Sequence, residues 1–352
     1  MSELTLDSVD WGIFRLKEIF DIENCKCSKV SGLKEGNIPY VGATNQNNGT
    51  VSYLYNYPHL ITKGNCLVFI CDGEGSMGFS FYKEADFIGT TTVKVGRNKN
   101  LNKFNGMFIS TVADTVRGKY NFGYKRNELR LKNETLTLPI SSEGSPNWKF
   151  MEDYTKQELK LQSQKVSNYF QNKLIKLGDE QTPLEIEWRA FWMEELIDIS
   201  PGVRLTKTDQ IAGDIPFIGA TDSNNGITEF VGNINNSIDN NVLGVNYNGS
   251  VVENFYHSYE CIFSDDVKRI KFKNKKYGDE FTYLFLKQLI LSQKSKYQYG
   301  YKFNTKRMNR QKIMLPIDEN GDPNWQYMSN FIKNLEKENI ERIIEYLNLY
   351  NQ

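Results

Sequence analysis

The sequence predicts an α+β protein in which two similar, mainly β domains follow one another and two long helices pack together as an antiparallel coiled coil. Two observations predict this fold. The chain repeats itself at a shift of 177 residues, and each copy ends in a long segment without Gly or Pro. The 352 residues also suffice for two domains that each have a hydrophobic core.

The internal repeat is clearest at the two ends of each copy. Its matching segments are WGIF (11–14) with WRAF (188–191), GNIPYVGATNQNNG (36–49) with GDIPFIGATDSNNG (213–226), FGYKRN (122–127) with YGYKFN (299–304), and LPISSEGSPNWKFM (138–151) with LPIDENGDPNWQYM (315–328). In the middle of the copies the shift slips to 174, where 74–82 best match 248–256. Duplication followed by divergence explains this pattern.

Both copies have the same internal order. The front of each copy is rich in short β-branched and aromatic runs bounded by Asn-Gly turns, which predicts strands. After Pro-Asn-Trp the texture changes to helical periodicity, as in Leu159, Val166 and Phe170. The predicted division is 1–147 for the first domain, 148–178 for its helix, 179–187 for a linker, 188–323 for the second domain and 324–352 for its helix.

A helix of about 30 residues is roughly 45 Å long, which exceeds what such a domain needs for its own closure. We therefore expect the two helices to pack on each other as a spacer. The alternative is that each helix folds back onto its own domain.

Charge is balanced overall, with 43 Lys and Arg against 43 Asp and Glu, but it is uneven along the chain. The stretch 281–317 holds eight basic residues and no acidic one, and 88–127 holds eight against Asp114. Basic residues interleaved with aromatic ones suit contact with nucleic-acid phosphates. A solvated charged face explains any single one of these residues better, but the repetition in both copies favours DNA. The candidate contacts are Arg97, Arg117, Lys119, Tyr120, Lys125 and Arg126 in the first copy, and Lys294, Lys296, Tyr297, Lys302, Lys306 and Arg307 in the second.

One loop differs between the copies inside a shared frame. Asn45 and Gln46 in the first copy correspond to Asp222 and Ser223 in the second, and each pair is followed by the same residue, Asn47 or Asn224; all six are candidate base contacts. Asn and Gln pair well with adenine edges and Asp with the cytosine amino group, so the difference fits two distinct base sequences. The alternative is a plain hairpin in which Asn-Gly supplies the positive φ.

No catalytic or metal centre is predicted. The segment 73–78 fits G-x-G-x-x-G, but the residues after it predict a strand, whereas a dinucleotide site requires a helix there. The two histidines, His59 and His257, lack ligand spacing, and no Pro has the Pro neighbour that an amino-methyltransferase motif needs. The five cysteines have no zinc or disulfide pattern, and the charged N-terminal segment lacks a signal peptide, so we expect a cytoplasmic protein with reduced thiols.

The repeated motifs resemble the specificity subunits of type I restriction-modification systems and the similar subunits of type IIB systems. The resemblance rests on I-P-Y/F-V/I-G-A-T followed by N-N-G, on Phe/Tyr-Gly-Tyr-Lys before Leu-Pro-Ile, and on Pro-Asn-Trp before a helix, all present twice. It implies two target recognition domains that each read one half of a bipartite site in double-stranded DNA, and two helices that act as a ruler.

The resemblance also implies partners. These are adenine-DNA methyltransferase subunits, which carry S-adenosylmethionine, together with a Mg²⁺-dependent nuclease or translocase subunit or a fused nuclease; this chain itself would hold no cofactor. By analogy, the spacer helices open at Trp148 and Trp325 and meet through Leu159, Val166, Phe170, Leu335, Ile343 and Leu347. Rival interpretations are a tandem all-β module for a ligand such as carbohydrate, and a cryptic nuclease.

Overall fold

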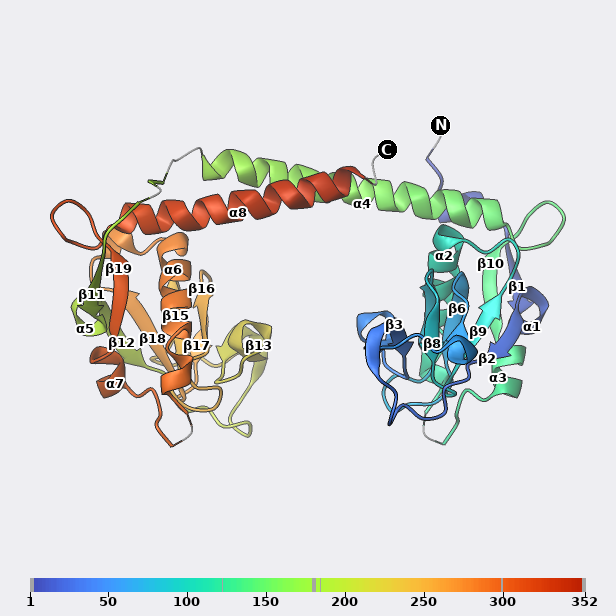
Figure 1. Cartoon of the computed structure of the whole chain (residues 1–352), viewed down its shortest axis with the longest axis horizontal. Helices are drawn as coiled ribbons and strands as arrows, with labels where there is room; N and C mark the ends of the chain where they lie inside the picture. Colours follow the sequence, from blue (N-terminus) through green and yellow to red (C-terminus); the bar gives the residue numbers. More distant parts are fainter. Residues whose placement is uncertain (1–2, 122, 179–181, 184, 299, 350–352) are drawn as a thin grey trace. The chain divides into compact units, whose positions relative to one another are not determined.

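A computed structural model describes residues 3–121, 123–178, 182–183, 185–298 and 300–349 (Figure 1). The chain divides into two compact units, one formed by Met1–Val166 with Leu347–Gln352 and the other by Ser167–Tyr346. Each unit thus contains parts of both long helices. The predicted linker 179–187 falls partly outside the described residues.

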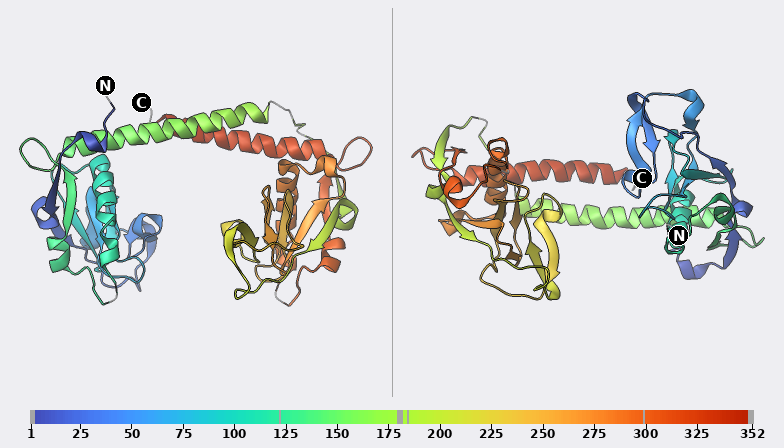
Figure 2. Two further views of the ribbon diagram at one scale, coloured as in Figure 1. Left: turned by 180° about the vertical axis from the view of Figure 1, so that it is seen from behind. Right: turned by 90° about the horizontal axis from the view of Figure 1, so that it is seen from below.

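The first unit is built from short strands around a few helices. Its strands are β1 (Trp11–Arg15), β2 (Asp21–Asn24), β3 (Glu35–Val41), β4 (Thr50–Leu54), β5 (Ile61–Thr62), β6 (Cys66–Ile70), β7 (Ser80–Lys83), β8 (Phe87–Gly89), β9 (Val93–Arg97) and β10 (Thr135–Pro139). Its helices are α1 (Leu16–Ile19), α2 (Lys103–Asp114), α3 (Glu128–Asn133) and most of α4 (Trp148–Leu177). The strands form sheets in the orders β1-β10, β2-β9-β6-β7 and β4-β3-β8-β5, and α2 packs on β7. Figure 2 shows the teal helix α2 beside the strands of this unit.

The second unit repeats this plan. Its strands are β11 (Trp188–Trp192), β12 (Ile197–Pro201), β13 (Ala212–Ile218), β14 (Ile227–Val231), β15 (Val242–Asn246), β16 (Asn254–His257), β17 (Ile262–Phe263), β18 (Val267–Phe272) and β19 (Lys312–Pro316). Its helices are α5 (Met193–Leu196), α6 (Glu280–Leu291), α7 (Thr305–Asn309) and most of α8 (Trp325–Asn348). The sheets are β11-β19, β12-β18-β15-β16 and β14-β13-β17.

Strand register is the same in the two copies. Trp11 lies opposite Pro139 in the β1-β10 pair, and Trp188 lies opposite Pro316 in the β11-β19 pair. A register slip by one residue would turn every core side chain outward, so the shared register preserves one buried face in both units. The predicted α+β tandem fold is thus confirmed.

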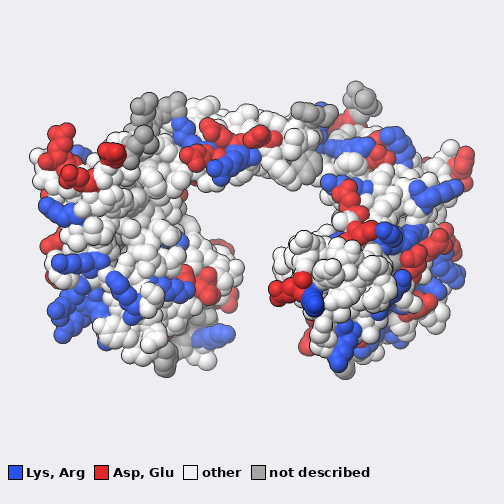
Figure 3. All heavy atoms as spheres, viewed as in Figure 1, with Lys and Arg blue, Asp and Glu red and all other residues white. Residues whose placement is uncertain are grey.

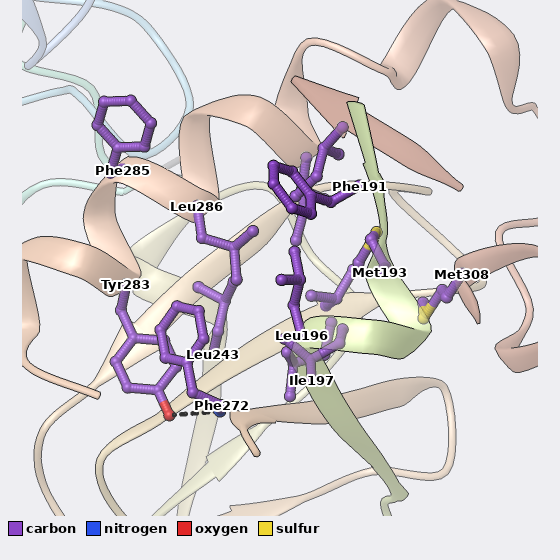
Figure 4. Packing of buried hydrophobic residues seen from close by; sticks show 14 of the residues in the cluster. Phe191, Met193, Leu196, Ile197, Leu243, Phe272, Tyr283, Phe285, Leu286 and Met308 are labelled. Atoms are coloured by element: carbon purple, nitrogen blue, oxygen red, sulfur yellow. Dashed lines mark hydrogen bonds between the residues drawn. The ribbon is translucent and has the colours of Figure 1, made fainter. Parts of the chain in front are cut away.

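The core of the second unit joins the β11-β19 pair to the larger sheet. Phe191 and Met193 from β11 and α5 meet Leu286 from α6 and Leu243 from β15 (Figure 4). All of these side chains are nearly or fully buried. Full burial of one such side chain stabilises the fold by about 1.5–3 kcal/mol. The cluster therefore attaches the β11-β19 pair, which comes from the two ends of the repeat, to the sheet and helix that come from its middle.

Both long helices begin at the tryptophan of Pro-Asn-Trp, as predicted. The preceding asparagines cap them: the side-chain oxygen of Asn147 accepts from the backbone N–H of Phe150 at 3.0 Å, and that of Asn324 accepts from Tyr327 at 2.9 Å. Such caps typically contribute about 1 kcal/mol. The tryptophans then pack edge to face on the core, Trp148 on Phe20 with centroids 6.1 Å apart and Trp325 on Phe272 at 5.0 Å.

The long helices contact each other within each unit. In the second unit Lys173 of α4 forms an ion pair with Glu336 of α8, and the Asn334 amide lies 3.4 Å from the Thr182 hydroxyl just beyond α4. In the first unit the Ser163 hydroxyl donates to the carbonyl oxygen of Leu347 at 2.9 Å. Rising numbers on one helix meet falling numbers on the other, so the helices run antiparallel, as predicted.

The residues that fill the buried positions differ from the predicted seam. Val166 and Leu335 are 40% and 41% exposed and Ile343 is 37% exposed, whereas Ser163 and Ser167 are buried. The remaining predicted members are half-buried: Leu159, Phe170 and Leu347. A pattern search that counts apolar side chains misses serines, whose small size permits close approach of two helices.

The first turns of each long helix pack onto the helix's own domain, as the alternative arrangement proposed. Met151 of α4 belongs to the core of the first unit and Met328 of α8 to the core of the second. Each long helix therefore has a domain-bound start and a later part that meets the other helix.

Candidate nucleic-acid interface

The variable loop has the same backbone in both units. Asn47, Asn48 and Gly49 have φ values of 49°, 50° and 73°, and residues 224–226 have 49°, 52° and 78°. In each copy the glycine N–H donates to the carbonyl three residues back, at 2.9 Å. Positive φ is tolerated by Asn and Gly, so the predicted Asn-Gly turn is confirmed.

A strand with an aromatic side chain lies beneath each loop, and that side chain explains why a glycine stands above it. A Cβ on Gly49 would lie 2.2 Å from the ring of Phe81 on β7, and one on Gly226 would lie 3.2 Å from Phe255 on β16. The glycine thus lets the loop rest on the sheet, which fixes the loop above it.

The hydrogen bonds that anchor the two loops come from different side chains. In the first unit the buried Lys83 ammonium donates to the carbonyl oxygen of Asn48 at 3.2 Å and to the Thr50 hydroxyl at 2.8 Å. Burial lowers the pKa of Lys83 below its ordinary value. In the second unit the Asn225 amide donates to the Tyr259 hydroxyl at 3.0 Å, and that hydroxyl lies 3.1 Å from Nδ1 of His257.

His257 is a buried packing residue, as predicted. Its ring stands edge to face against Phe263 at 5.5 Å, and its Nε2 has no hydrogen-bond partner within the described part of the chain. Burial lowers the pKa of His257 to about 4, so the imidazole is neutral near neutral pH.

Acid should therefore destabilise the second unit through His257. The pKa is near 6.5 in the unfolded chain and about 4 in the folded one, so the contribution is fully present above pH 6.5 and is lost as pH falls towards 4. The loss amounts to about 3 kcal/mol. Urea unfolding of His257→Gln and of the unchanged chain between these pH values should show a shallower pH dependence for the variant; parallel curves would contradict the assignment.

In the first unit the loop opens onto a hollow of about 690 Å³. The hollow brings together three of the predicted contact residues, Asn45, Arg117 and Tyr120, beside the turn 72–75. The Arg117 guanidinium lies 4.5 Å from the centre of the Phe79 ring. The G-x-G-x-x-G segment 73–78 leads into strand β7, as predicted, whereas a dinucleotide site requires a helix there.

A stack of two tyrosines and an arginine occurs at the same place in both copies. Tyr120 and Tyr124 stack with centroids 6.1 Å apart, and the Arg130 guanidinium lies 3.8 Å from the centre of the Tyr124 ring. Their counterparts are Tyr297, Tyr301 and Arg307, with values of 5.7 Å and 3.7 Å. Tyr124 and Tyr301 are about half exposed. Sequence reasoning missed Tyr124, Arg130 and Tyr301, although the 177-residue shift relates all three pairs.

Arg126 is a correction to the predicted contacts. Its side chain is fully buried and forms an ion pair with buried Glu134, and it also donates to the Ser80 hydroxyl at 3.0 Å. Burial and the Glu134 carboxylate raise the pKa of Tyr120, whose hydroxyl donates to the same carboxylate. Phe303 and Gln311 stand at the equivalent positions of the second unit, so this polar cluster is particular to the first.

Arg97 likewise serves the fold. It donates to the carbonyl oxygens of Lys63 and Gly64 at 2.6 and 2.8 Å and pairs with Glu23. The other predicted basic residues lie at the surface or are half-buried: Lys119, Lys125, Lys294, Lys296, Lys302 and Lys306. Among them, Lys125 pairs with Asp72 and Lys294 with Glu253.

The described residues contain no cluster of three or more His, Cys, Asp or Glu side chains that could hold a metal ion. Nor does any described helix combine the length and apolar character needed to cross a membrane.

Comparison with known proteins shows the family to which these two units belong. Residues 8–168 and 185–345 each match the type I restriction modification DNA specificity domain. The chain is 38% identical over 342 residues to the type II restriction enzyme BgcI specificity subunit S.BcgI of Heyndrickxia coagulans, covering 96% of this chain and 98% of the relative. Its fold is similar to that of the type I restriction-modification S subunit from M. genitalium, with a TM-score of 0.57 at 13% identity over 99% of this chain and 95% of the other.

These matches define a DNA specificity subunit of a restriction-modification system, which is a non-catalytic component with two target recognition domains. The chain belongs to the type I restriction modification DNA specificity family.

Proposed function

We propose that the chain reads a two-part sequence in double-stranded DNA, one half with domain 1–147 and the other with domain 188–323. One observation carries the proposal: the loops at 47–49 and 224–226 share one backbone, yet Asn45-Gln46 in the first copy corresponds to Asp222-Ser223 in the second. A fixed frame with exchanged polar side chains suits recognition of different base edges.

The proposed contacts combine base reading and phosphate binding. In the first unit they are Asn45, Gln46, Asn47, Arg117, Lys119, Tyr120 and Lys125, and in the second Asp222, Ser223, Asn224, Lys294, Lys296, Tyr297, Lys302, Lys306 and Arg307. Arg126 and Arg97 are left out because the core and the strand ends occupy their side chains. Phosphate contacts set register and base contacts supply sequence preference.

The chain is proposed to act in the cytoplasm with adenine-methyltransferase subunits that carry S-adenosylmethionine, and with a Mg²⁺-dependent nuclease activity in a partner. Two points support partner binding by the long helices. Val166, Leu335 and Ile343 leave apolar surface exposed on α4 and α8, and the relative S.BcgI is a subunit of a restriction enzyme. The helices 148–178 and 324–352 are proposed to set the gap between the half-sites.

Methylome sequencing of cells with and without this gene tests the proposal. We expect one asymmetric, two-part adenine-methylation motif to disappear with the gene, because the methyltransferase would lose its sequence reader. Restoring the gene on a plasmid should restore the motif. An unchanged methylome in a strain whose partner methyltransferase is active would overturn the proposal.

A further inference from the structure

A basic hollow of about 500 Å³ lies beside α7 in the second unit. It is lined by Tyr297, Tyr301, Asn304, Lys306, Arg307 and Arg310. Figure 3 shows Lys and Arg side chains gathered over this part of the unit. Three cations and no carboxylate line the hollow, which favours an anionic ligand.

We infer that this hollow binds the DNA backbone and that the second unit makes the larger electrostatic contribution to DNA binding. The inference rests on the proposed function and deepens it, because it assigns phosphate contact to one surface and makes the two domains unequal. Arg310 joins Lys306 and Arg307 as a contact residue.

The contacts of these three basic side chains leave them available to bind an external anion. The Arg307 guanidinium lies 3.7 Å from the centre of the Tyr301 ring and donates to the carbonyl oxygen of Lys302 at 2.6 Å, which fixes its plane and leaves other N–H groups for a ligand. The side chains of Lys306 and Arg310 make no hydrogen bond or ion pair with any residue that the structure describes. A fixed guanidinium in one hollow with two cations that lack a partner among the described residues suits contact with phosphates along a strand.

The first unit has the same frame with less charge. Asn127 caps α3 as Asn304 caps α7, through bonds to the backbone N–H groups of Arg130 and Arg307 at 2.9 and 3.1 Å. Leu129, which is 71% exposed, replaces Lys306, and Asn133 replaces Arg310.

Carboxylates offset the basic residues that remain in the first unit. Glu128 of α3 pairs with Lys94 and Lys132, and Asp72 pairs with Lys125 at 2.7 Å. Residues 127–133 thus carry two cations and one carboxylate, whereas the equivalent 304–310 carry three cations and none. The first unit therefore offers DNA fewer uncompensated charges at this position.

Salt dependence of binding measures the proposed contacts. The full chain is titrated with a duplex of arbitrary sequence between about 50 and 200 mM salt, where each neutralised phosphate contributes about 0.9 to the slope of log affinity against log salt. Lys306→Gln with Arg310→Gln should lower the slope by about 1.8. Leu129→Lys with Asn133→Arg should raise it by a similar amount, because these changes copy the second unit into the first.

Lys275→Gln with Lys276→Gln is the matched control, since it removes two exposed cations elsewhere in the second unit. Unchanged unfolding midpoints show that all variants are folded. Equal slope changes for the control and the α7 variant, or no change for the α7 variant, would overturn the inference. If the unchanged chain fails to bind duplex DNA in a salt-dependent way, the proposed function fails as well, so the two failures are distinguishable.

Discussion

Replacing Glu134 by glutamine should lower the free energy of unfolding of the first unit by about 3–5 kcal/mol, because it leaves the Arg126 charge buried without its partner. The Arg126 guanidinium is fully buried and donates to both carboxylate oxygens of Glu134 and to the carbonyl oxygen of Gly78 at 3.1 Å. Removing one member of a buried pair costs far more than the pair itself contributes, since the remaining ion loses its hydration as well as its partner.

The second unit supplies the matched control. There Phe303 occupies the position of Arg126 and Gln311 that of Glu134, and the Gln311 side-chain oxygen accepts from the Tyr297 hydroxyl at 2.8 Å. Asn254, which replaces Ser80, donates to the carbonyl oxygen of Val252 at 3.0 Å, as Arg126 does to that of Gly78 in the first unit. The second copy therefore solves the same packing problem without an ion pair.

The triple replacement Ser80→Asn, Arg126→Phe and Glu134→Gln should consequently recover most of the stability lost by Glu134→Gln alone. Hydrogen exchange measured on peptides from both units localises the effect, and the second unit should exchange as before. The expected fall in melting temperature of the first unit for Glu134→Gln is roughly 6–20 °C. A single variant as stable as the unchanged chain would contradict a buried charge at Arg126.

The features that could be predicted correctly from the sequence are those that neighbouring residues determine. The helix starts at Trp148 and Trp325 follow from Pro-Asn-Trp before long segments free of Gly and Pro, and the turn at Asn48-Gly49 follows from the tolerance of these residues for positive φ. The duplication strengthened each prediction, because every signal occurs twice at one shift.

What it missed depends on contacts between distant positions. Arg126 lies in a basic run and reads as a surface cation, and only the fold shows that it is buried with Glu134. The buried serines Ser163 and Ser167 carry no apolar signal, so a seam of large side chains was predicted instead. Burial is a property of the packed chain, and composition reports it only on average.

Exchanging the variable loop residues should exchange base preference. With Asn45→Asp and Gln46→Ser the first domain carries the polar side chains of the second on an unchanged backbone, because the left-handed residues 47–49 and 224–226 superpose in φ. A good base contact discriminates by about 1–3 kcal/mol, so affinity for the original first half-site should fall roughly 10- to 100-fold. Binding selection from a randomised duplex pool, with the chain in its methyltransferase complex, measures the new preference.

The reverse exchange, Asp222→Asn with Ser223→Gln, should alter only the other half-site, and this reciprocity separates reading from folding. Gly49→Ala serves as the second control, since its Cβ would meet the Phe81 ring and it should weaken first-half binding without creating a new preference. If both exchanges leave every base preference as it was while Gly49→Ala weakens binding, the loop is a scaffold turn. Sequence reading would then lie with other side chains around the hollow that Arg117 and Tyr120 line.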